Sequence, residues 1–482
     1  MRFHLSNSLT YSIAGSAVAI ILVFQLLNLT TVSLWHDEAF SGLLVQYEDY
    51  GEMLYRIGLD VHPPLYYIIL RAWTDIVGTS LYALRSFSLI FGLLTALGTY
   101  ILAREIFRNR SIALLALFFM LFGSFQIQYN MEARMYTLGT FFIVFSSIVL
   151  LKALKTKSTI RWLVYAILTA AAIYTHYLIV FLVFAQGLFI LLRRANPKFA
   201  FLAFGLIGLS YLPWLPTFLR QLKQVEEAFW IPPLSRWSIP TTLAKMTTGE
   251  GMNPQLVPYI LIAISGLVVA ALGLMLWKYK QQDKWLLALG FFIPFGGAIL
   301  LSLRTSIYLD RYFIFVLPFL MIILASVIIS KRLLIVLAMI GIVISYPVHW
   351  YINGLANQPG MNSAAAYLEE FVAPQDVIVV NSSFVYFTFR YYNQTSIQPV
   401  LYAPSELLHY SGTALLVEDD TISNFQGIAN PGDTVWTIDT TGFGNYQPEI
   451  PSSWKKISEK DFSDAYIHRG SIIVRQYIVN GM

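Results

Sequence analysis

Long apolar runs recur along most of the chain and limit it to one kind of architecture. They cover residues 10–34, 86–103, 111–131, 135–151, 162–175, 177–192, 199–219, 255–277, 285–303, 312–330 and 333–350. A helix needs roughly 20 apolar residues to cross hydrocarbon, and each run comes near that length, although 162–175 is short. Only 12% of the 482 residues are charged, against about 25% in soluble domains. We therefore predict a polytopic α-helical membrane protein with about eleven transmembrane helices.

The ends of these runs predict which side of the membrane each loop faces. Basic clusters lie at Arg104/Arg108/Arg110, Lys152/Lys155/Lys157/Arg161, Arg193/Arg194/Lys198, Lys278/Lys280/Lys284 and Lys331/Arg332. With a cytoplasmic N-terminus, all five fall on the cytoplasmic side of the plasma membrane, as the positive-inside rule requires. This holds only if residues 63–78 do not cross. That stretch is short, opens with Pro-Pro and contains Arg71 and Asp75, so we expect a juxtamembrane helix.

The overall composition excludes several functional classes. The chain has no cysteine, so disulfides, a thiolate nucleophile and cysteine-ligated metals are excluded. A net charge of +5 is small for this length, and we interpret the basic residues as topological markers, not as a nucleic-acid surface. The first apolar run exceeds a signal-peptide core of roughly 7–15 residues, so we expect a retained first helix.

The last 130 or so residues have a different composition and predict a separate extracytoplasmic domain. No membrane-length run occurs there, and "DVIVV", "ALLV", "TVWTI" and "SIIVRQYIV" have the pattern of short buried strands. The stretches "NSAAAYLEEFV" and "SSFVYFTFRYYN" have the pattern of helices. We predict a transmembrane domain over residues 1–350, with a first outer loop at 35–85, and an α/β domain over 351–482. A lid or an acceptor-docking module is the simplest role for the α/β domain.

Ionisable residues collect at the predicted outer face. The candidates are Asp37, Glu38, Asp60 and His62 in the first loop, Arg85 opening the second span, Glu132 and Arg134 ending the third, and Arg311 between the ninth and tenth. A carboxylate can take a proton from an attacking hydroxyl, and arginine binds a phosphate through two parallel hydrogen bonds. The pattern suits transfer between a lipid-linked phosphate and a hydroxyl.

Other interpretations stay open at this point. Arg85 and Arg311 fit snorkelling anchors equally well, and Glu132 and Arg134 fit a local ion pair. A multi-pass transporter or flippase of a lipid-linked or anionic substrate would also use buried arginines. Against that alternative, the apolar runs show no paired broken half-repeats. A non-catalytic scaffold would not need the loop carboxylates.

Several motifs resemble those of the GT-C membrane glycosyltransferases. "WHDEAFS" and "DVHPPLYY" resemble the protein O-mannosyltransferase-like group, glycosyltransferase family 39, and "EARMYTL", "THYL", "YLPWLP" and "DRYFIFVLP" resemble its bacterial branch in the same order. The resemblance covers roughly residues 10–350. It implies a GT-C fold and an inverting transfer of a sugar, hexosyl or pentosyl, from a polyprenyl-phosphate carrier. The acceptor would be an envelope glycan, a lipid or a protein at the outer membrane face.

The resemblance also implies roles for individual residues. Asp37 would be the general base with Glu38 beside it, and Arg85 would contact the carrier phosphate. Arg134 and Arg311 match the bacterial pattern, and Asp60, His62 and Glu132 complete the expected substrate-binding set. Some relatives carry a glutamate directly before the Pro-Pro pair that binds a divalent metal ion. Here His62 holds that position, so the resemblance carries over no certain cofactor and leaves the metal open.

Overall fold

The structure is a computed structural model that describes residues 7–156, 158–194, 197–228, 230–249, 257–328, 360–442, 444–445, 448–464 and 470–480. The chain divides into two units. The helical unit comprises Met1–Leu27, His62–Ile69 and Arg85–His349. The second unit comprises Asn28–Val61, Leu70–Leu84 and Trp350–Met482. The predicted C-terminal domain thus shares a unit with much of the predicted first outer loop.

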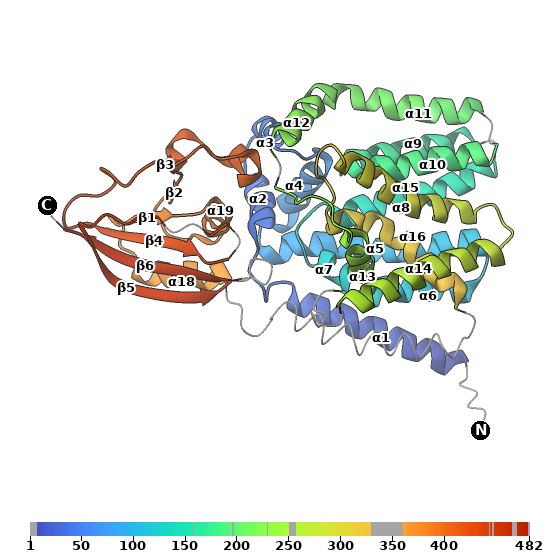
Figure 1. Cartoon of the computed structure of the whole chain (residues 1–482), viewed down its shortest axis with the longest axis horizontal. Helices are drawn as coiled ribbons and strands as arrows, with labels where there is room; N and C mark the ends of the chain where they lie inside the picture. The colour runs from blue at the N-terminus through green and yellow to red at the C-terminus, as the bar shows by residue number, and fades with distance from the viewer. Residues whose placement is uncertain are drawn as a thin grey trace. The chain divides into compact units, whose positions relative to one another are not determined.

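Helices that run side by side make up the helical unit (Figure 1). Neighbouring pairs include α8 with α9, α10 with α15, and α6 with α16. The elements are α1 (Asn7–Asn28), α5 (Leu81–Phe107), α6 (Arg110–Phe122), α7 (Ser124–Asn130), α8 (Tyr136–Leu154), α9 (Thr159–Ile173), η1 (Tyr177–Ile179), α10 (Val180–Leu192), α11 (Pro197–Tyr211), η2 (Leu212–Trp214), α12 (Leu215–Glu227), α13 (Ser238–Thr248), α14 (Val257–Lys278), α15 (Lys284–Ser302), η3 (Asp310–Val316) and α16 (Leu317–Val327).

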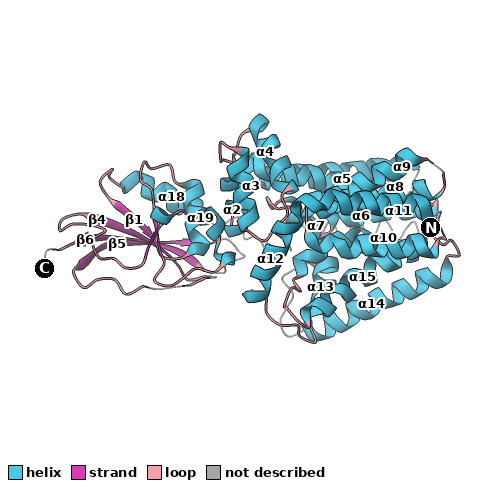
Figure 2. Cartoon of the chain, turned by 90° about the horizontal axis from the view of Figure 1, so that it is seen from above, coloured by secondary structure: helices cyan, strands magenta, loops and turns pink. Residues whose placement is uncertain are grey.

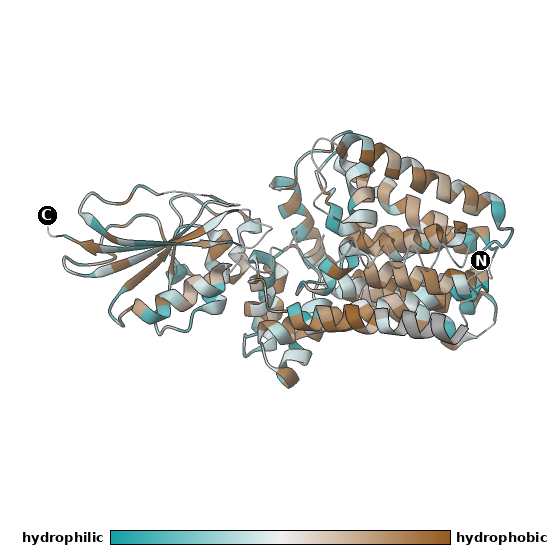
Figure 3. Cartoon of the chain, turned by 90° about the horizontal axis from the view of Figure 1, so that it is seen from below, coloured by the Kyte–Doolittle hydropathy of each residue, from teal (hydrophilic) through white to brown (hydrophobic). Residues whose placement is uncertain are grey.

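The helices coincide with the predicted spans. The first ten predicted runs each contain helix, and the last, 333–350, lies outside the described residues. Within the described part of the chain, six helices are long and apolar enough to cross a membrane, or seven if α6 and α7 form one span. The segments 18–28, 159–173 and 177–192 are apolar but shorter. These lengths fit a polytopic membrane protein, and the helices are apolar over most of their length (Figure 3).

A break at Gly123 separates α6 from α7. The two helices meet at an angle of 58°, and the Gly123 N–H still donates to the Phe119 carbonyl at 3.0 Å. A Cβ at Gly123 would lie 2.7 Å from that carbonyl oxygen, so a side chain would force the backbone apart. The bend therefore depends on glycine, and it directs α7 toward the turn before α8.

Two ion pairs join helix ends that carry predicted basic clusters, and the predicted cluster at Lys331/Arg332 lies outside the described residues. Lys155, just after α8, pairs with Glu105 near the end of α5. Arg193, just after α10, lies 2.9 Å from Asp283 before α15. These contacts join helix ends that the positive-inside rule assigns to one side of the membrane.

In the second unit, short helices of the predicted outer loop accompany a mixed sheet (Figure 2). Among the described residues, strands occur only in this unit. The elements are α2 (His36–Leu44), α3 (Tyr50–Leu59), α4 (Leu65–Val77, which begins in the helical unit), α18 (Gly360–Phe371), β1 (Val377–Val380), α19 (Ser383–Tyr392), β2 (Val400–Tyr402), η4 (His409–Ser411), η5 (Thr413–Leu415), η6 (Glu418–Asp420), β3 (Thr421–Ile422), β4 (Thr434–Thr440), β5 (Trp454–Ser463) and β6 (Ser471–Val479). At 13 residues, α4 is shorter than the roughly 20 that span a membrane.

The described strands form a sheet in the order β3-β2-β1-β4-β6-β5. The first four run parallel, whereas β6 and β5 are antiparallel to their neighbours. The predicted strands at β1, β4 and β6 and the predicted helices at α18 and α19 are confirmed. The predicted strand "ALLV" is wrong: residues 413–415 form the short helix η5, which begins after Gly412 at φ 79°. A short apolar run does not distinguish a buried strand from a buried turn.

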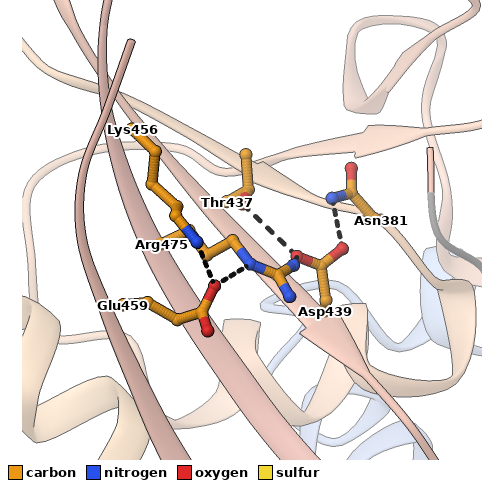
Figure 4. A network of polar contacts seen from close by, with 6 residues as sticks. All are labelled: Asn381, Thr437, Asp439, Lys456, Glu459 and Arg475. Carbon is orange, nitrogen blue, oxygen red and sulfur yellow. Dashed lines mark hydrogen bonds and ion pairs between the residues drawn. The ribbon is translucent and has the colours of Figure 1, made fainter. Parts of the chain in front are cut away.

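A polar network ties three strands of this sheet together (Figure 4). On β6, Arg475 donates to Asp439 of β4 at 2.5 Å and to Glu459 of β5 at 2.6 Å. Asn381 donates to the second Asp439 oxygen at 2.6 Å. Burial raises the pKa of Asp439, although Asn381 and Arg475 act in the opposite direction. The network therefore holds a carboxylate that is 1% exposed.

Candidate active site

The predicted acid pair opens helix α2, where the two carboxylates have different surroundings. The backbone is extended at Trp35, directly before the helix. The Trp35 N–H donates to the Glu38 carboxylate at 3.3 Å, so Glu38 satisfies a donor at the helix start. Glu38 is 1% exposed, whereas Asp37 is only half-buried. Asp37 is therefore the carboxylate of this pair that solvent reaches.

Helix α19 of the C-terminal sheet domain packs against α2. The His36 ring lies 5.2 Å from the Phe384 ring and 5.6 Å from the Phe387 ring. Just before α2, the Leu34 N–H donates to the Tyr392 hydroxyl at 3.0 Å. Near the other end of α2, a Cβ on Gly42 would lie 2.8 Å from the Tyr391 ring, so glycine is required for this close approach. These contacts fix the helix that bears Asp37 within the second unit.

Asp60 ends helix α3 in the second unit. Its N–H donates to the carbonyls of Arg56 at 3.3 Å and Ile57 at 3.2 Å, and the residue is 8% exposed. Arg56 in turn donates to the Leu416 carbonyl at 3.0 Å. Asp60 therefore stands directly before the "VHPP" turn as a helix C-cap.

In the helical unit, Arg134 and His62 meet although 72 residues separate them. The Arg134 guanidinium lies 3.1 Å from His62 Nε2 and 3.4 Å from the Tyr67 hydroxyl. Guanidinium groups only donate hydrogen bonds, so Nε2 accepts and the His62 proton is on Nδ1. Arg134 is 2% exposed. The helical unit thus holds a buried guanidinium in a fixed orientation.

Glu132 and His176 complete this cluster. The backbone N–H of Arg134 donates to the backbone carbonyl of Glu132 at 2.8 Å. This hydrogen bond forms a tight turn between α7 and α8. His176, in the turn between α9 and η1, packs against Tyr312 at 5.1 Å and Phe315 at 4.8 Å. Burial, then the neighbouring His62 and Arg134, hold the pKa of His176 well below its ordinary value.

A chain of side chains supports the loop at His62. Gln221 of α12 donates to the His62 carbonyl at 3.4 Å. The Tyr177 hydroxyl donates to Gln221 and accepts from the Trp214 indole at 2.9 Å. The arrangement connects α12 and the "YLPWLP" segment to the Arg134–His62 cluster.

The two other predicted arginines lie in different settings. Arg85, near the start of α5, is 4% exposed. This burial disfavours a snorkelling role, which would place the charged head in water. Arg311 is half-buried and lies 5.6 Å from the centre of the Trp230 ring. Its neighbour Asp310 pairs with Lys245 at 2.8 Å.

The structure therefore unites some predicted site residues and adds others. His62, Glu132 and Arg134 lie together in the helical unit, while Asp37, Glu38 and Asp60 belong to the second unit. His176, which was not among the predicted site residues, lies beside Arg134 and His62. Tyr67, Gln221 and Lys245 were not predicted. Tyr67 lies within the "DVHPPLYY" motif and was open to prediction, but no motif marks the segments with Gln221 and Lys245.

A divalent metal ion does not fit at His62. Its Nε2 accepts from a guanidinium at 3.1 Å, and that positive charge would repel a cation. Among the described residues, no group of three or more His, Cys, Asp or Glu side chains is placed to hold a metal.

The chain combines a bundle of apolar helices with a mixed α/β sheet, which is the GT-C fold predicted from the sequence. Residues 61–216 match the family described as dolichyl-phosphate-mannose-protein mannosyltransferase. The crystal structure of ArnT from Cupriavidus metallidurans bound to undecaprenyl phosphate is similar over 95% of this chain and 97% of that chain, with 11% identity and a TM-score of 0.65. The crystal structure of the same ArnT in the apo state is similar over 97% of this chain and 98% of that chain, with 10% identity and a TM-score of 0.66.

No curated protein matches this sequence. The similar solved structures nevertheless confirm the predicted GT-C fold. The family match, together with these structures, confirms the resemblance to this group.

Proposed function

We propose that this protein is an inverting glycosyltransferase that moves a sugar from a polyprenyl-phosphate carrier to an acceptor hydroxyl at the outer membrane face. The observation that supports it most is the buried Arg134, oriented by His62 and Tyr67. It precedes α8, whereas Lys155 follows that 19-residue helix, so the two ends lie about 28 Å apart. A fixed guanidinium at the end remote from the basic clusters suits a phosphate at the outer membrane edge.

The reaction is a single displacement. The acceptor oxygen bonds to the anomeric carbon as the bond from that carbon to the phosphate oxygen breaks, which inverts the anomeric centre. Asp37 takes the hydroxyl proton as general base. The polyprenyl phosphate leaves with the bonding electron pair, and Arg85, Arg134 and Arg311 stabilise its charge.

The remaining predicted residues position these groups. Glu38 holds the start of α2 through the Trp35 N–H, and Asp60 ends the helix before the His62 turn. Glu132 shapes the turn that presents Arg134. The likeness to ArnT, whose solved structure contains undecaprenyl phosphate, supports a polyprenyl-phosphate donor for this chain as well.

The transporter alternative fits the helical unit less well. Transporters of this kind place substrate sites near the membrane midplane, on broken helices. Here the charged residues of α5 and α8 lie near helix ends: Arg85, Arg104 and Glu105 on α5, and Lys152 on α8. Midway along the bundle, Gln186 donates to Ser146 and Ser147 at 2.9 and 3.0 Å, a neutral contact of the kind that joins membrane helices.

The proposal is tested by transfer from synthetic polyprenyl-phosphate sugars with purified protein and an extract of the host envelope. We expect release of carrier phosphate that requires the acceptor, and we expect an Arg134→Ala variant to lose most of it. Cells without the gene should accumulate the lipid-linked sugar. Donor binding without phosphate release in any acceptor extract would instead support a transporter.

A further inference from the structure

A pocket of about 420 Å³ opens in the second unit, beside the helix that bears Asp37. Gln46 and Tyr47 line it just after the C-terminal end of α2, Arg390 lines it from α19, and Asn393, Ser396 and Gln398 line it from the segment between α19 and β2. Its volume falls within the range of roughly 300–1,000 Å³ that is usual for small-ligand sites. Its walls come from segments about 340 residues apart in sequence.

The charge of this pocket is balanced without a ligand. Arg390 is the one charged residue among those that line it, and its guanidinium lies 3.2 Å from the Asp420 carboxylate. Gln398 donates to the other Asp420 oxygen at 3.0 Å, and Asp420 is 1% exposed. A cation already paired with a buried carboxylate gives little net attraction for an anionic ligand. The pocket therefore favours a neutral occupant.

The lining matches a ligand rich in hydroxyl groups. The side-chain amides of Gln46, Asn393 and Gln398 each donate one N–H within the protein, to the Gly42 carbonyl, the Ile397 carbonyl and the Asp420 carboxylate. An amide nitrogen carries a second N–H, and the Ser396 hydroxyl can both donate and accept. Each hydroxyl of a sugar likewise donates one hydrogen bond and accepts others. The Tyr47 ring adds an aromatic surface on which an apolar sugar face can pack.

Local hydrogen bonds fix the walls in advance. Thr395 N–H donates to Asn393 Oδ1 at 3.1 Å, and Asn393 Nδ2 donates to the Ile397 carbonyl at 2.9 Å. Arg71 donates to the Val45 carbonyl at 2.9 Å, which fastens the chain just after α2. A pre-formed wall reduces the ordering cost of binding.

The pocket and Asp37 share one short helix. Helix α2 has nine residues, so about 13 Å separates its two ends. A short glycan covers such a distance. Asp37 is therefore within the reach of a short glycan that is seated against Gln46 and Tyr47.

We propose that this pocket is an acceptor subsite for a neutral, hydroxyl-rich carbohydrate. The proposal rests on the glycosyltransferase function proposed above and narrows its acceptor. In this arrangement the pocket holds a sugar of the acceptor one or more units away from the hydroxyl that Asp37 deprotonates.

The test uses the absence of native cysteine. Ser396→Cys, at an exposed position in the pocket, is labelled with a bulky maleimide. Ser452→Cys, on an exposed turn of the same unit that does not line the pocket, is the matched control. The first readout is the labelling rate with the neutral or the anionic oligosaccharide fraction of the host envelope. The second is the transfer kinetics of the labelled proteins with a synthetic polyprenyl-phosphate sugar.

We expect the neutral fraction to slow labelling at position 396 but not at 452. Labelling at 396 should raise KM for the acceptor by about tenfold or more. The bulky label would remove one or two neutral hydrogen bonds to the acceptor and the contact area around them. The KM for the donor should not change. Unchanged labelling and unchanged acceptor KM would overturn the subsite, and protection by the anionic fraction alone would overturn its neutral character.

The labelling readout does not depend on catalysis, so the two proposals can fail separately. Protection at position 396 without any sugar transfer would refute the glycosyltransferase function and leave a carbohydrate-binding pocket. Transfer without protection or any kinetic effect at 396 would refute the subsite alone.

Discussion

At the scale of single residues, the two adjacent carboxylates of the proposed site have unlike surroundings. Glu38 is buried and accepts the Trp35 N–H, whereas Asp37 is half-buried. A general base must reach the proton it abstracts, which favours Asp37 for that role. Glu38 instead fixes the backbone from which Asp37 projects.

Asp37→Asn should reduce sugar transfer at least about a hundredfold, since general-base catalysis contributes roughly 10²–10⁴-fold. The amide keeps the size of the side chain but removes the proton acceptor. Transfer and the melting temperature are measured together, and we expect melting to change little. Glu38→Gln should be milder, because the amide oxygen still accepts from Trp35 N–H. Near-normal transfer by Asp37→Asn would move the base elsewhere, with Asp60 as the next candidate.

Arg85→Ala should lower donor use about ten- to a hundredfold, because a hydrogen bond to a charged group contributes about 1.5–3 kcal/mol. Arg85→Lys should restore only part of it, since a point charge lacks the bidentate geometry. The matched control is Arg304→Ala, whose side chain is 81% exposed and pairs with a partly exposed Glu226. Unchanged donor kinetics in Arg85→Ala would remove Arg85 from the carrier site.

At the scale of elements, helix α19 joins the sheet domain to α2, the helix that bears the proposed base. The Tyr392 hydroxyl accepts from the Leu34 N–H directly before α2, and the His36 ring packs against Phe384 and Phe387. The C-terminal domain is thus more than a passive appendage, because it helps to hold the helix that bears the proposed base.

Tyr392→Phe should lower kcat several-fold and leave KM for the donor unchanged, since it removes one hydrogen bond of about 0.5–1.5 kcal/mol. If Tyr392 acts through Asp37, the same change made in the Asp37→Asn background should have almost no further effect. Tyr367→Phe on α18 is the control, because no hydrogen bond from its hydroxyl is described. Equal effects in both backgrounds would mean that Tyr392 contributes only general stability.

Arg475→Met should destabilise the protein by about 3 kcal/mol near pH 7, because it leaves the buried Asp439 without its charge partner. The loss should be smaller near pH 4. Burial raises the pKa of Asp439, so the folded state binds that proton more readily and loses stability as pH rises. Arg475 also lowers the pKa of Glu459. The stability that this interaction contributes is present at neutral pH and is lost in acid, when Glu459 binds a proton.

This pH dependence is measured by thermal melting of the full chain at both pH values. Lys456→Ala, which removes only an exposed partner of Glu459, should change stability within about 0.5 kcal/mol. A larger effect of Arg475→Met at pH 4 than at pH 7 would contradict the assigned sign.

The pattern of apolar residues predicted helices and strands well where the element is buried in lipid or in the core. It predicted them poorly where the element is exposed. The apolar runs each contain a helix within the described residues, because lipid demands apolar side chains all round. Strand β5, "WKKISEKDFS", was missed because it lies at the edge of the sheet and exposes its charged side chains. The Arg134–His62 contact was equally hidden, since sequence spacing does not show which helix ends meet.

At the scale of the whole molecule, membrane topology decides whether the proposed chemistry has access to its substrates. The contacts of Lys155 with Glu105 and of Arg193 with Asp283 place basic clusters at one end of the helical unit. The Arg134–His62 cluster lies at the other end of α8. If the basic end is cytoplasmic, the guanidinium lies at the outer edge, where lipid-linked donors of this kind would be used.

Cysteine labelling tests this orientation without background, because the chain contains no native cysteine. An impermeant maleimide added to intact cells should label Ser452→Cys in the sheet domain but not Lys155→Cys or Lys280→Cys. Both lysine positions should become reactive once the membrane is permeabilised, which controls for burial. The positive-inside rule gives this result only if α4 does not cross the membrane, since one extra crossing would move every later cluster outside. Labelling of Lys280→Cys in intact cells, with no labelling of Ser452→Cys, would invert the orientation and remove the outer-face reaction.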